Sequence, residues 1–351
     1  MREYLLPADG QFYKVNMHCH TVFSDGKTTP EEVKAAYKAA GYSAVAFTEH
    51  EGMLDQSALT DDEFIAITSF EYSVWNREKS PFAVYDGPPH TIDHTECVHI
   101  NLYSPDPHDT AMPCYNPQYL WGNIAKYESE LKYVGTPDFE RKYTVESLNE
   151  VIRAAHERNM LVVFNHPHWS LNDSPLYTKL EGLDGFEIDN GTCTIASDLD
   201  YTPYAYDYLA RAGKRMPCVA GDDNHNPAHY FHAWTMVKAP ALTYDGLFNA
   251  LRKGECYASS GPEIYDLYVE DSRVYVRCSE AAGIFLTTIG RRKDCLVPKD
   301  ENERVTEASF RLNPEDYCFR ITIRDSRGRH ANSRFYYLDE LKEKIQPIVK
   351  K

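Results

Sequence analysis

Two kinds of segment alternate along most of the chain. Short runs of small and apolar residues, typical of buried strands, are followed by longer amphipathic segments that are typical of helices. The first unit begins with the extended VNMHCH (15–20), continues with a helix expected over residues 29–40, and ends with the strand SAVAFTEH (43–50). A T-P-E-E start and a glycine directly after the last helical residue mark the two ends of this helix.

The same alternation recurs further along the chain. Strands are expected at IAITSFE (65–71), CVHINLY (97–103), MLVVFNHPH (160–168), GFEIDN (185–190) and MPCVAGDDNH (216–225), and helices at TVESLNEVIRAAHERN (144–159), YAYDYLARAGK (204–214) and YDGLFNALRKG (244–254). Repeated alternation of this kind predicts a parallel sheet with helices packed outside it, closed or open. Binding and catalytic sites usually assemble at the carboxyl ends of such parallel strands.

Two stretches interrupt this alternation and are expected to be insertions. Residues 72–95 have little periodicity, and residues 104–143 are rich in tyrosine, tryptophan and phenylalanine. Long insertions in such a fold often form lids or binding loops. The other interpretation is a packing cluster or a subunit interface, because aromatic side chains are frequent there too.

Near Gly261 and Pro262 the pattern changes to alternating apolar and polar residues. Segments such as IYDLYVE (264–270) and YCFRITIRD (317–325) are separated by turn signals, which predicts antiparallel strands. We therefore expect two domains: an α/β domain over residues 1–262 and a small, sandwich-like antiparallel β domain over residues 263–351.

Composition narrows the range of functions. The 351 residues carry a formal net charge of −16 and are 42% hydrophobic, which is enough to bury a large core. The negative charge argues against a surface that tracks long duplex nucleic acid, although an anion can still bind at a metal site. The sequence has no apolar run long enough to span a membrane, and its nine cysteines form no C-x-x-C pair, so we expect a cytoplasmic protein with reduced thiols.

Histidines and carboxylates gather at the ends of the predicted strands. His18 and His20 are two residues apart, so both side chains leave an extended strand on the same face. Seven further residues of these types lie at strand ends or in the turns that follow: Asp25, His50, Glu71, His99, His166, Asp223 and His225. Imidazole and carboxylate donors in this number suit two or three divalent ions such as Zn, Mn or Fe. The alternative is a set of unrelated polar strand ends.

The ordered motifs resemble those of the PHP (polymerase and histidinol phosphatase) superfamily. The matching elements are H-x-H followed by S-D-G, T-E-H, an isolated Glu, an isolated His, N-H-P-H and G-D-D-N-H, spread over roughly residues 14–262. The segments GECYASSGP and DSRGRHANS are similar to two-domain PHP metallohydrolases of the CehA/McbA type. This resemblance implies a distorted (β/α)7 barrel with a bi- or trinuclear metal site.

The resemblance also implies which residues bind which ion. It assigns the nine donors to three ions: His18, His20, Glu71 and Asp223 to the first, Glu71, His99 and His166 to the second, and Asp25, His50 and His225 to the third. Some relatives carry histidine where this chain has Asp25, so the match is weaker at the third ion. Asp222 replaces the serine of the more frequent G-S-D-x-H form, so we take Asp223 as the ligand and Asp222 as a residue behind it.

A site of this composition predicts a hydrolase. We expect a metal-dependent phosphoesterase in which a metal-bridging hydroxide attacks a small anionic phosphoester, such as a nucleotide, a short oligonucleotide or a sugar phosphate. His168, two residues beyond His166, is the candidate proton donor to the leaving group, or else a hydrogen-bonding partner behind the ligands. Two alternatives remain: a hydrolase of carbamates, carboxylic esters or amides at the same site, and a non-catalytic binding protein with a structural metal.

Overall fold

A computed structural model describes residues 2–76 and 95–341 of the chain, which form a mixed α/β fold, as predicted. The strands are β1 (Glu3–Tyr4), β2 (Gln11–Asn16), β3 (Ala44–His50), β4 (Ile65–Trp75), β5 (Cys97–Tyr103), β6 (Ala111–Met112), β7 (Lys132–Tyr133), β8 (Leu161–Phe164), β9 (Gly185–Asn190), β10 (Cys218–Gly221), β11 (Trp234–Ala239), β12 (Cys256–Ser259), β13 (Ile264–Glu270), β14 (Arg273–Ala281), β15 (Gly283–Thr288), β16 (Lys293–Leu296), β17 (Val305–Arg311), β18 (Cys318–Arg324), β19 (His330–Ser333) and β20 (Tyr336–Tyr337). The α-helices are α1 (Pro30–Ala39), α2 (Val145–Glu157), α3 (Ser174–Tyr177), α4 (Gly191–Ser197), α5 (Pro203–Arg211) and α6 (Tyr244–Lys253). Within these described ranges, none of the helices is long and apolar enough to cross a membrane.

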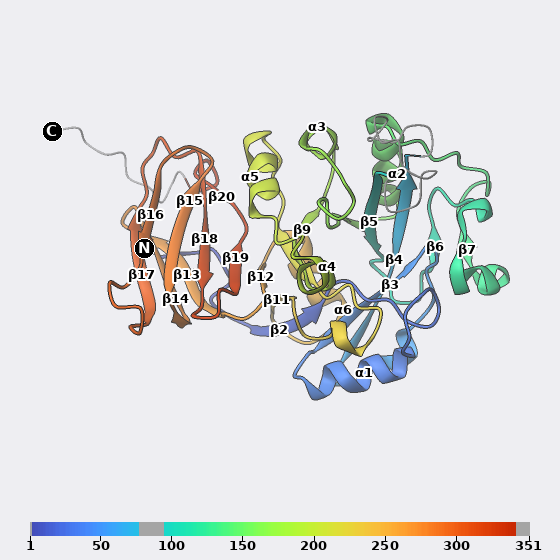
Figure 1. The fold of residues 1–351 in the computed structure, drawn as a ribbon, viewed down its shortest axis with the longest axis horizontal. Helices are drawn as coiled ribbons and strands as arrows, with labels where there is room; N and C mark the ends of the chain where they lie inside the picture. Colours follow the sequence, from blue (N-terminus) through green and yellow to red (C-terminus); the bar gives the residue numbers. More distant parts are fainter. Residues whose placement is uncertain (1, 77–94, 342–351) are drawn as a thin grey trace.

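Most strands belong to one large sheet. Its order is β10-β9-β8-β5-β4-β3-β2-β11-β12-β19-β18-β15-β16, and a smaller sheet has the order β1-β13-β14-β17. Figure 1 shows the C-terminal strands β13–β19 gathered at one end of the molecule and β3–β7 at the other, with α1 along one side. The part of the large sheet from β2 to β10 is the one that carries the predicted ligands.

Helix α1 lies where the sequence predicts it. Thr29 Oγ1 accepts a hydrogen bond from the Glu32 N–H at 3.3 Å, and Glu32 Oε2 accepts one from the Thr29 N–H at 2.8 Å. This capping box satisfies backbone groups that the first helical turn leaves unpaired. Val33 and Tyr37 on the buried face pack in one cluster with Phe47 of β3, which fixes the helix against the sheet.

The sheet departs from the prediction at β5. This strand runs antiparallel to both of its neighbours, β4 and β8, whereas the alternation predicts parallel strands throughout. The ladder pairs Trp75 with Cys97, so the chain leaves β4 and enters β5 at the same edge of the sheet. Strands joined at one edge are antiparallel, since a parallel strand needs a crossover to the opposite edge.

The strand ladder is open where the expected barrel would close. In the described chain, β10 is the end of the ladder, and β2 pairs with β11 on the side away from β3. Two hydrogen bonds join the segments that follow these strands: the Asp223 N–H donates to His18 O at 2.9 Å and the His20 N–H to Asn224 O at 3.0 Å. Of the expected distorted (β/α)7 barrel, only the mixed α/β fold is therefore confirmed; β2 and β10 are linked through the segments that follow them.

The C-terminal strands continue the large sheet across the predicted domain boundary. β12 pairs with β19, and β19 with β18, all antiparallel. Buried side chains of these strands and of the smaller sheet form one hydrophobic cluster, which also includes Leu5 and Leu6 from the N-terminal segment. The strands after residue 262 are thus antiparallel, while the division of the chain into two domains at that residue stays a prediction.

The predicted insertion at residues 104–143 packs against the edge of the large sheet that carries the ligands. Ile124 and Leu131 are buried in the same core cluster as Phe70 of β4. The Asn123 N–H donates to Ser24 O, and Asn123 Nδ2 to Val22 O, both at 3.1 Å. The insertion therefore contacts the turn that follows His20. Of the other predicted insertion, residues 72–75 extend β4, and residues 77–94 lie outside the described residues.

A buried ion pair fixes the end of the 104–143 insertion. Arg141 Nη1 donates to Glu51 Oε2 at 2.6 Å and to Ser73 O at 2.7 Å. The guanidinium lies over the rings of Tyr72 and Tyr119, with its carbon 3.8 and 4.5 Å from their centroids. The side chains of Arg141 and Glu51 are only 5% and 2% exposed, so removing one charge leaves the other buried without compensation.

Replacing Arg141 by methionine is expected to destabilise the protein by about 3–5 kcal/mol, because Glu51 keeps a buried charge without its partner. Adding Glu51→Gln to the same chain should recover part of this loss. Denaturant unfolding of wild type, single variant and double variant measures both effects. Equal stability of the single and double variants would contradict a coupled pair.

Asp189 on β9 is a buried carboxyl group whose environment disfavours its charge. Burial raises the pKa of Asp189 to about 7, even though Ser260 and Thr194 hydrogen-bond to it, and the charges of Glu187 and Asp222 add to the rise. An unfolded aspartate ionises near pH 4. Between about pH 4 and 7, the folded state therefore holds a proton that the unfolded state has lost, and this group makes stability fall as the pH rises.

The variant Asp189→Asn removes this titration. From pH 5 to pH 8, we expect the unfolding free energy of the variant to rise relative to wild type by about 2 kcal/mol. Denaturation curves of both proteins at the two pH values provide the comparison, in which the other titrating groups cancel. A difference that does not change with pH would show that Asp189 keeps an ordinary pKa.

Candidate metal centre

The edge of the sheet where β3 ends collects the candidate ligands. His50 is the last residue of β3 and pairs in register with Glu71 on β4. Because β5 runs the other way, it starts near this edge, and His99 is its third residue. The antiparallel strand thus delivers a histidine from its beginning to the place where its neighbours deliver theirs from their ends.

Three further candidate ligands lie just beyond strand ends. His18, His166 and Asp223 each follow the last residue of their strands, β2, β8 and β10, by two positions. Asp223 has a positive φ of 51°, a left-handed conformation that aspartate tolerates better than most residues. The backbone hydrogen bond from Asp223 to His18 holds these two ligands side by side.

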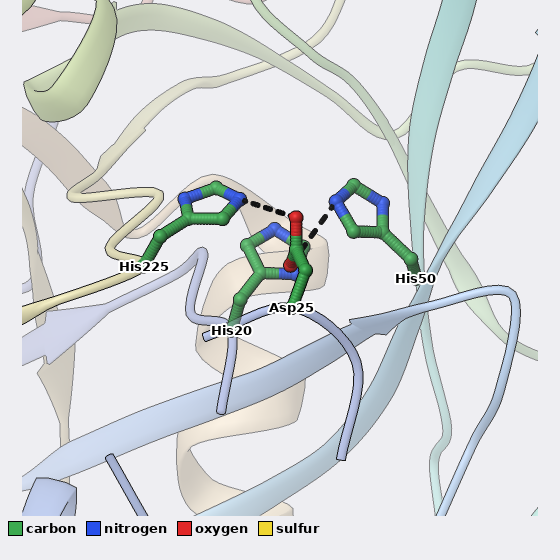
Figure 2. A group of neighbouring side chains, drawn as sticks. All are labelled: His20, Asp25, His50 and His225. Carbon is green, nitrogen blue, oxygen red and sulfur yellow. Dashed lines mark ion pairs between the residues drawn. The ribbon is translucent and has the colours of Figure 1, made fainter. Parts of the chain in front are cut away.

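The structure brings all nine predicted ligand residues together. They form four overlapping groups, each with donor atoms within 4.8 Å of one another: His20, Asp25, His50 and His225; His18, Glu71 and His166; His18, His20 and Asp223; and His50, Glu71 and His99. Figure 2 shows the first group, in which Asp25 lies between the rings of His50 and His225. This group contains His20 in addition to the three residues expected at the third ion.

Glu71 lies at the centre of the cluster. Its Oε1 is 3.2 Å from His18 Nε2, 3.1 Å from His99 Nδ1 and 3.2 Å from His166 Nε2. Its Oε2 is 2.9 Å from His50 Nδ1. With a side chain only 1% exposed, this carboxylate meets imidazoles on both oxygens, as a ligand shared between ions would.

The donor atoms of the cluster fit divalent cations. Six of them are buried and have no hydrogen-bond partner among the described residues: His18 Nε2, His20 Nε2, His50 Nδ1, His99 Nε2, Glu71 Oε2 and Asp223 Oδ1. Buried polar atoms in native proteins are almost always satisfied, so a group of six orphans requires a partner of another kind. These nitrogen and oxygen atoms lie close together but are not aligned for hydrogen bonds. Zn, Mn and Fe ions bind donors of these types.

Residues behind the ligands orient them. His18 Nδ1 lies 3.1 Å from Glu187 Oε1, and a proton on this nitrogen leaves Nε2 free to bind a metal. The other Glu187 oxygen accepts hydrogen bonds from the His166 N–H at 3.1 Å and from Asn190 Nδ2 at 3.0 Å. His166 Nδ1 lies 3.0 Å from Ser170 Oγ.

Sequence reasoning missed Glu187 and Ser170. Glu187 is the third residue of the strand GFEIDN and is fully enclosed, so it reads as an interruption of an apolar run rather than as part of a site. The signal in the sequence was an acidic residue between apolar neighbours in a predicted strand. Burying its charge is unfavourable unless the residue has a partner.

The charges of the cluster keep its carboxylates ionised. Burial disfavours the charge of Glu71, but His99, His18 and the other imidazoles around it hold its pKa well below the usual range. The pKa of Asp223 is also held well below its usual range, because His18 and His20 outweigh the effect of burial. Burial and the neighbouring charges of His50 and His225 lower the pKa of His20 to about 3. At neutral pH, His20 is therefore a neutral imidazole and the two acids are anions, the forms that bind metals.

A cavity of about 280 Å³ opens onto the cluster. Trp75, Trp121 and Trp169 form part of its wall, and sequence reasoning singled out none of them for the site. The ring of Trp121 lies 4.7 Å from that of His50, and the ring of Trp169 lies 5.2 Å from that of His166. Among the described residues, the lining of this cavity includes no lysine or arginine.

Two other predicted residues lie apart from the ligands. His168 is exposed, and its backbone N–H donates to Asp200 Oδ1 at 2.9 Å; its role as proton donor stays a prediction. Asp222 accepts hydrogen bonds from Tyr37 Oη at 2.7 Å and from the backbone N–H groups of residues 231–233. It therefore anchors the chain behind Asp223, in keeping with the expected supporting position.

The chain is similar to several known proteins. Residues 16–85 match the family model of the PHP domain, and no curated protein matches the chain. A two-domain protein from Bacteroides vulgatus containing a predicted PHP-like metal-dependent phosphoesterase has a TM-score of 0.43 and 15% identity, covering 95% of this chain and 97% of its own. A proposed metal-dependent phosphoesterase from Bifidobacterium adolescentis has a TM-score of 0.34 and 16% identity, covering 63% and 89%. An amidohydrolase from Chromobacterium violaceum, with bound sulfate and no metal, has a TM-score of 0.39 and 17% identity, covering 61% and 88%.

The segment that matches the PHP domain model contains part of the residue cluster. Five of the nine clustered residues fall within the matched segment: His18, His20, Asp25, His50 and Glu71. The other four residues of the cluster join them in the folded chain. The match to the PHP domain model therefore covers the N-terminal part of the site.

Proposed function

We propose that the protein is a metal-dependent phosphoesterase that hydrolyses a small phosphoester. The observation that carries this proposal is the set of six buried donor atoms without hydrogen-bond partners. A single structural ion needs about four ligands and leaves no open position. Nine clustered donor residues, seven of which line a cavity, support a site for more than one ion with room for a substrate.

Two or three divalent ions, Zn, Mn or Fe, would occupy the site. His18, His20 and Asp223 would hold one ion, and Glu71 would be shared with a second that His99 and His166 complete. Asp25, His50 and His225 would hold a third, with His20 in reach of it. When bound, such ions lower the pKa of a coordinated water and balance the negative charge of a phosphoester.

The protein's own residues orient the ligands and limit access. Glu187 fixes the tautomer of His18, and the backbone hydrogen bond between His18 and Asp223 fixes their separation. The tryptophan walls reduce the water around the cluster, which strengthens electrostatic interactions inside the cavity. His168 is proposed to donate a proton to the leaving group, a role that requires its exposed side chain to turn toward the substrate.

The size of the cavity favours a small substrate. About 280 Å³ is at the lower end of the range for small-molecule sites. A small anionic phosphoester fits this space, whereas long duplex nucleic acid would also require a basic surface that the net charge of −16 does not favour.

One observation favours a second candidate, a hydrolase of carbamates, carboxylic esters or amides. The described lining of the cavity has no lysine or arginine to attract a phosphate before it reaches the ions. A neutral carbonyl substrate needs no such cation, and the same ions would polarise its oxygen. The two candidates differ in their products, because only the first releases inorganic phosphate from a monoester.

Replacing His18 by alanine is expected to remove bound metal and to reduce phosphate release from 4-nitrophenyl phosphate by more than roughly 100-fold, since loss of a residue behind a ligand alone costs 10- to 100-fold. Elemental analysis and a phosphate assay on wild type and variant provide the measurements. The matched control is His108→Ala, whose side chain is 71% exposed and outside the cluster.

Two or three ions per wild-type chain together with phosphate release would support the phosphoesterase. Bound ions without phosphate release would favour the carbonyl hydrolase. A wild-type protein that binds no ion stoichiometrically after loading would contradict both candidates.

Replacing Glu187 by glutamine tests the support of His18. The neutral amide is a weaker acceptor for His18 Nδ1, so we expect metal affinity to fall by about 10- to 100-fold while the fold is kept. A competition titration against a chelator of known affinity measures the change. Affinity within about twofold of wild type would show that Glu187 has no part in orienting the ligand.

A further inference from the structure

A second cavity adjoins the metal centre. Its volume is about 300 Å³, and it shares two residues, Trp75 and Trp121, with the cavity over the ligands. Tyr119 and Tyr143 also line it, together with polar residues, so four aromatic rings face this cavity. A substrate held at the ions would therefore have room for its remaining part on the other side of the tryptophan pair.

Most tryptophans of the chain lie at the two cavities. Three of the four tryptophans of the chain line the cavity at the metal centre. The fourth, Trp234, lies elsewhere, with its ring 6.3 Å from that of Tyr42 and with Lys14 Nζ 3.8 Å from its centroid. Trp121 is 39% exposed, so its ring is available to a ligand.

The second cavity offers no free positive charge among its described lining. Its two cations are both paired: Arg141 with Glu51 at 2.6 Å, and Lys142 with Glu140 at 3.3 Å. A second phosphate would find no unpaired cation among the described residues that line this cavity. The charges of the lining therefore suit an uncharged group.

The hydrogen-bonding groups of this cavity include tyrosine hydroxyls that are already engaged and the exposed side chain of Gln118. The Tyr119 hydroxyl accepts from the Arg141 N–H at 3.0 Å, and the Tyr143 hydroxyl accepts from Asn172 Nδ2 at 3.1 Å. Two buried polar atoms in the lining have no partner among the described residues, Ser73 Oγ and Arg141 Nε. The rings of Trp75 and Trp121 suit the face of a flat aromatic ring, and the side chain of Gln118 could pair with a polar group on the edge of that ring.

We propose that the second cavity is the subsite for the part of the substrate that does not react, and that this part is an uncharged planar aromatic ring with one or two hydrogen-bonding groups on its edge. Trp121 stacks on this ring and determines specificity, while Gln118 in the lining binds its edge. The assignment of the reacting group to the ions rests on the proposed function; the assignment of the ring to this cavity rests on the cavity itself.

Binding of a ring that lacks any reacting group tests the subsite. The probe is 7-methoxy-4-methylcoumarin, a planar neutral ring with a carbonyl edge and no ionisable group to bind a metal. Calorimetric titration of the full-length protein should give saturable binding that Trp121→Ala weakens by about tenfold or more, the usual effect of losing a stacking partner. Trp121→Phe keeps a ring on the same site and should stay within about threefold of wild type.

Two controls make this experiment decisive. Trp234→Phe changes the tryptophan outside both cavities and should leave coumarin binding unchanged. Methyl β-glucoside, a neutral ring of similar bulk with several hydroxyls, should not bind measurably. Glucoside binding as tight as that of the coumarin, or coumarin binding that Trp121→Ala leaves unchanged in a folded protein, would overturn the proposal.

A kinetic comparison separates this proposal from the phosphoesterase activity. If the subsite is correct, 4-methylumbelliferyl phosphate should have a higher kcat/KM than glycerol phosphate, and Trp121→Ala should remove most of the difference. Coumarin binding that depends on Trp121, without phosphate release from either ester, would remove the phosphoesterase and keep the subsite. Phosphate release from both esters at equal kcat/KM, unaffected by Trp121→Ala, would support the phosphoesterase and contradict the subsite.

Discussion

The arrangement of this site depends on one fully buried carboxylate. Glu71 is ionised among five imidazoles, and it holds this state because positive or polarisable groups surround both of its oxygens. Burying an isolated carboxylate is very unfavourable, so the strands around Glu71 must deliver partners to it from several directions. β3 and β4 are paired in register there, and β5 reaches the same point by running in the opposite direction.

Local signals in the sequence predicted much of this fold. The capped helix α1 and the apolar strand β3 lie where their patterns place them, because capping residues and continuous apolar runs act over short distances. The direction of β5 did not follow, since it depends on how the chain passes from Trp75 to Cys97 and not on the composition of either strand. The sequence also did not predict that β2 and β10 are unpaired, because the periodicity of apolar residues carries no information on which strands pair.

The candidate site, like the fold, could be predicted from the sequence only in part. The clustering of the candidate ligands at strand ends was predictable, because topology brings strand ends together whatever the details of packing. Glu187 was missed because its partner, His18, is distant in the sequence. The tryptophans were missed for another reason: Trp75 and Trp169 are single aromatic residues beside strand ends, and Trp121 lay among the many aromatic residues of the 104–143 insertion, where packing and binding look alike.

The 104–143 insertion contributes to the shape of the cavities but not to the cluster of donor residues. It supplies Trp121 to the cavity and Arg141 to the ion pair with Glu51, but it contributes none of the nine clustered donors. A change of length or composition in this one segment can therefore alter the shape of the chamber while leaving the donor set untouched. Over evolutionary time, such a chain can acquire a new preference among molecules without rebuilding the centre that would act on them.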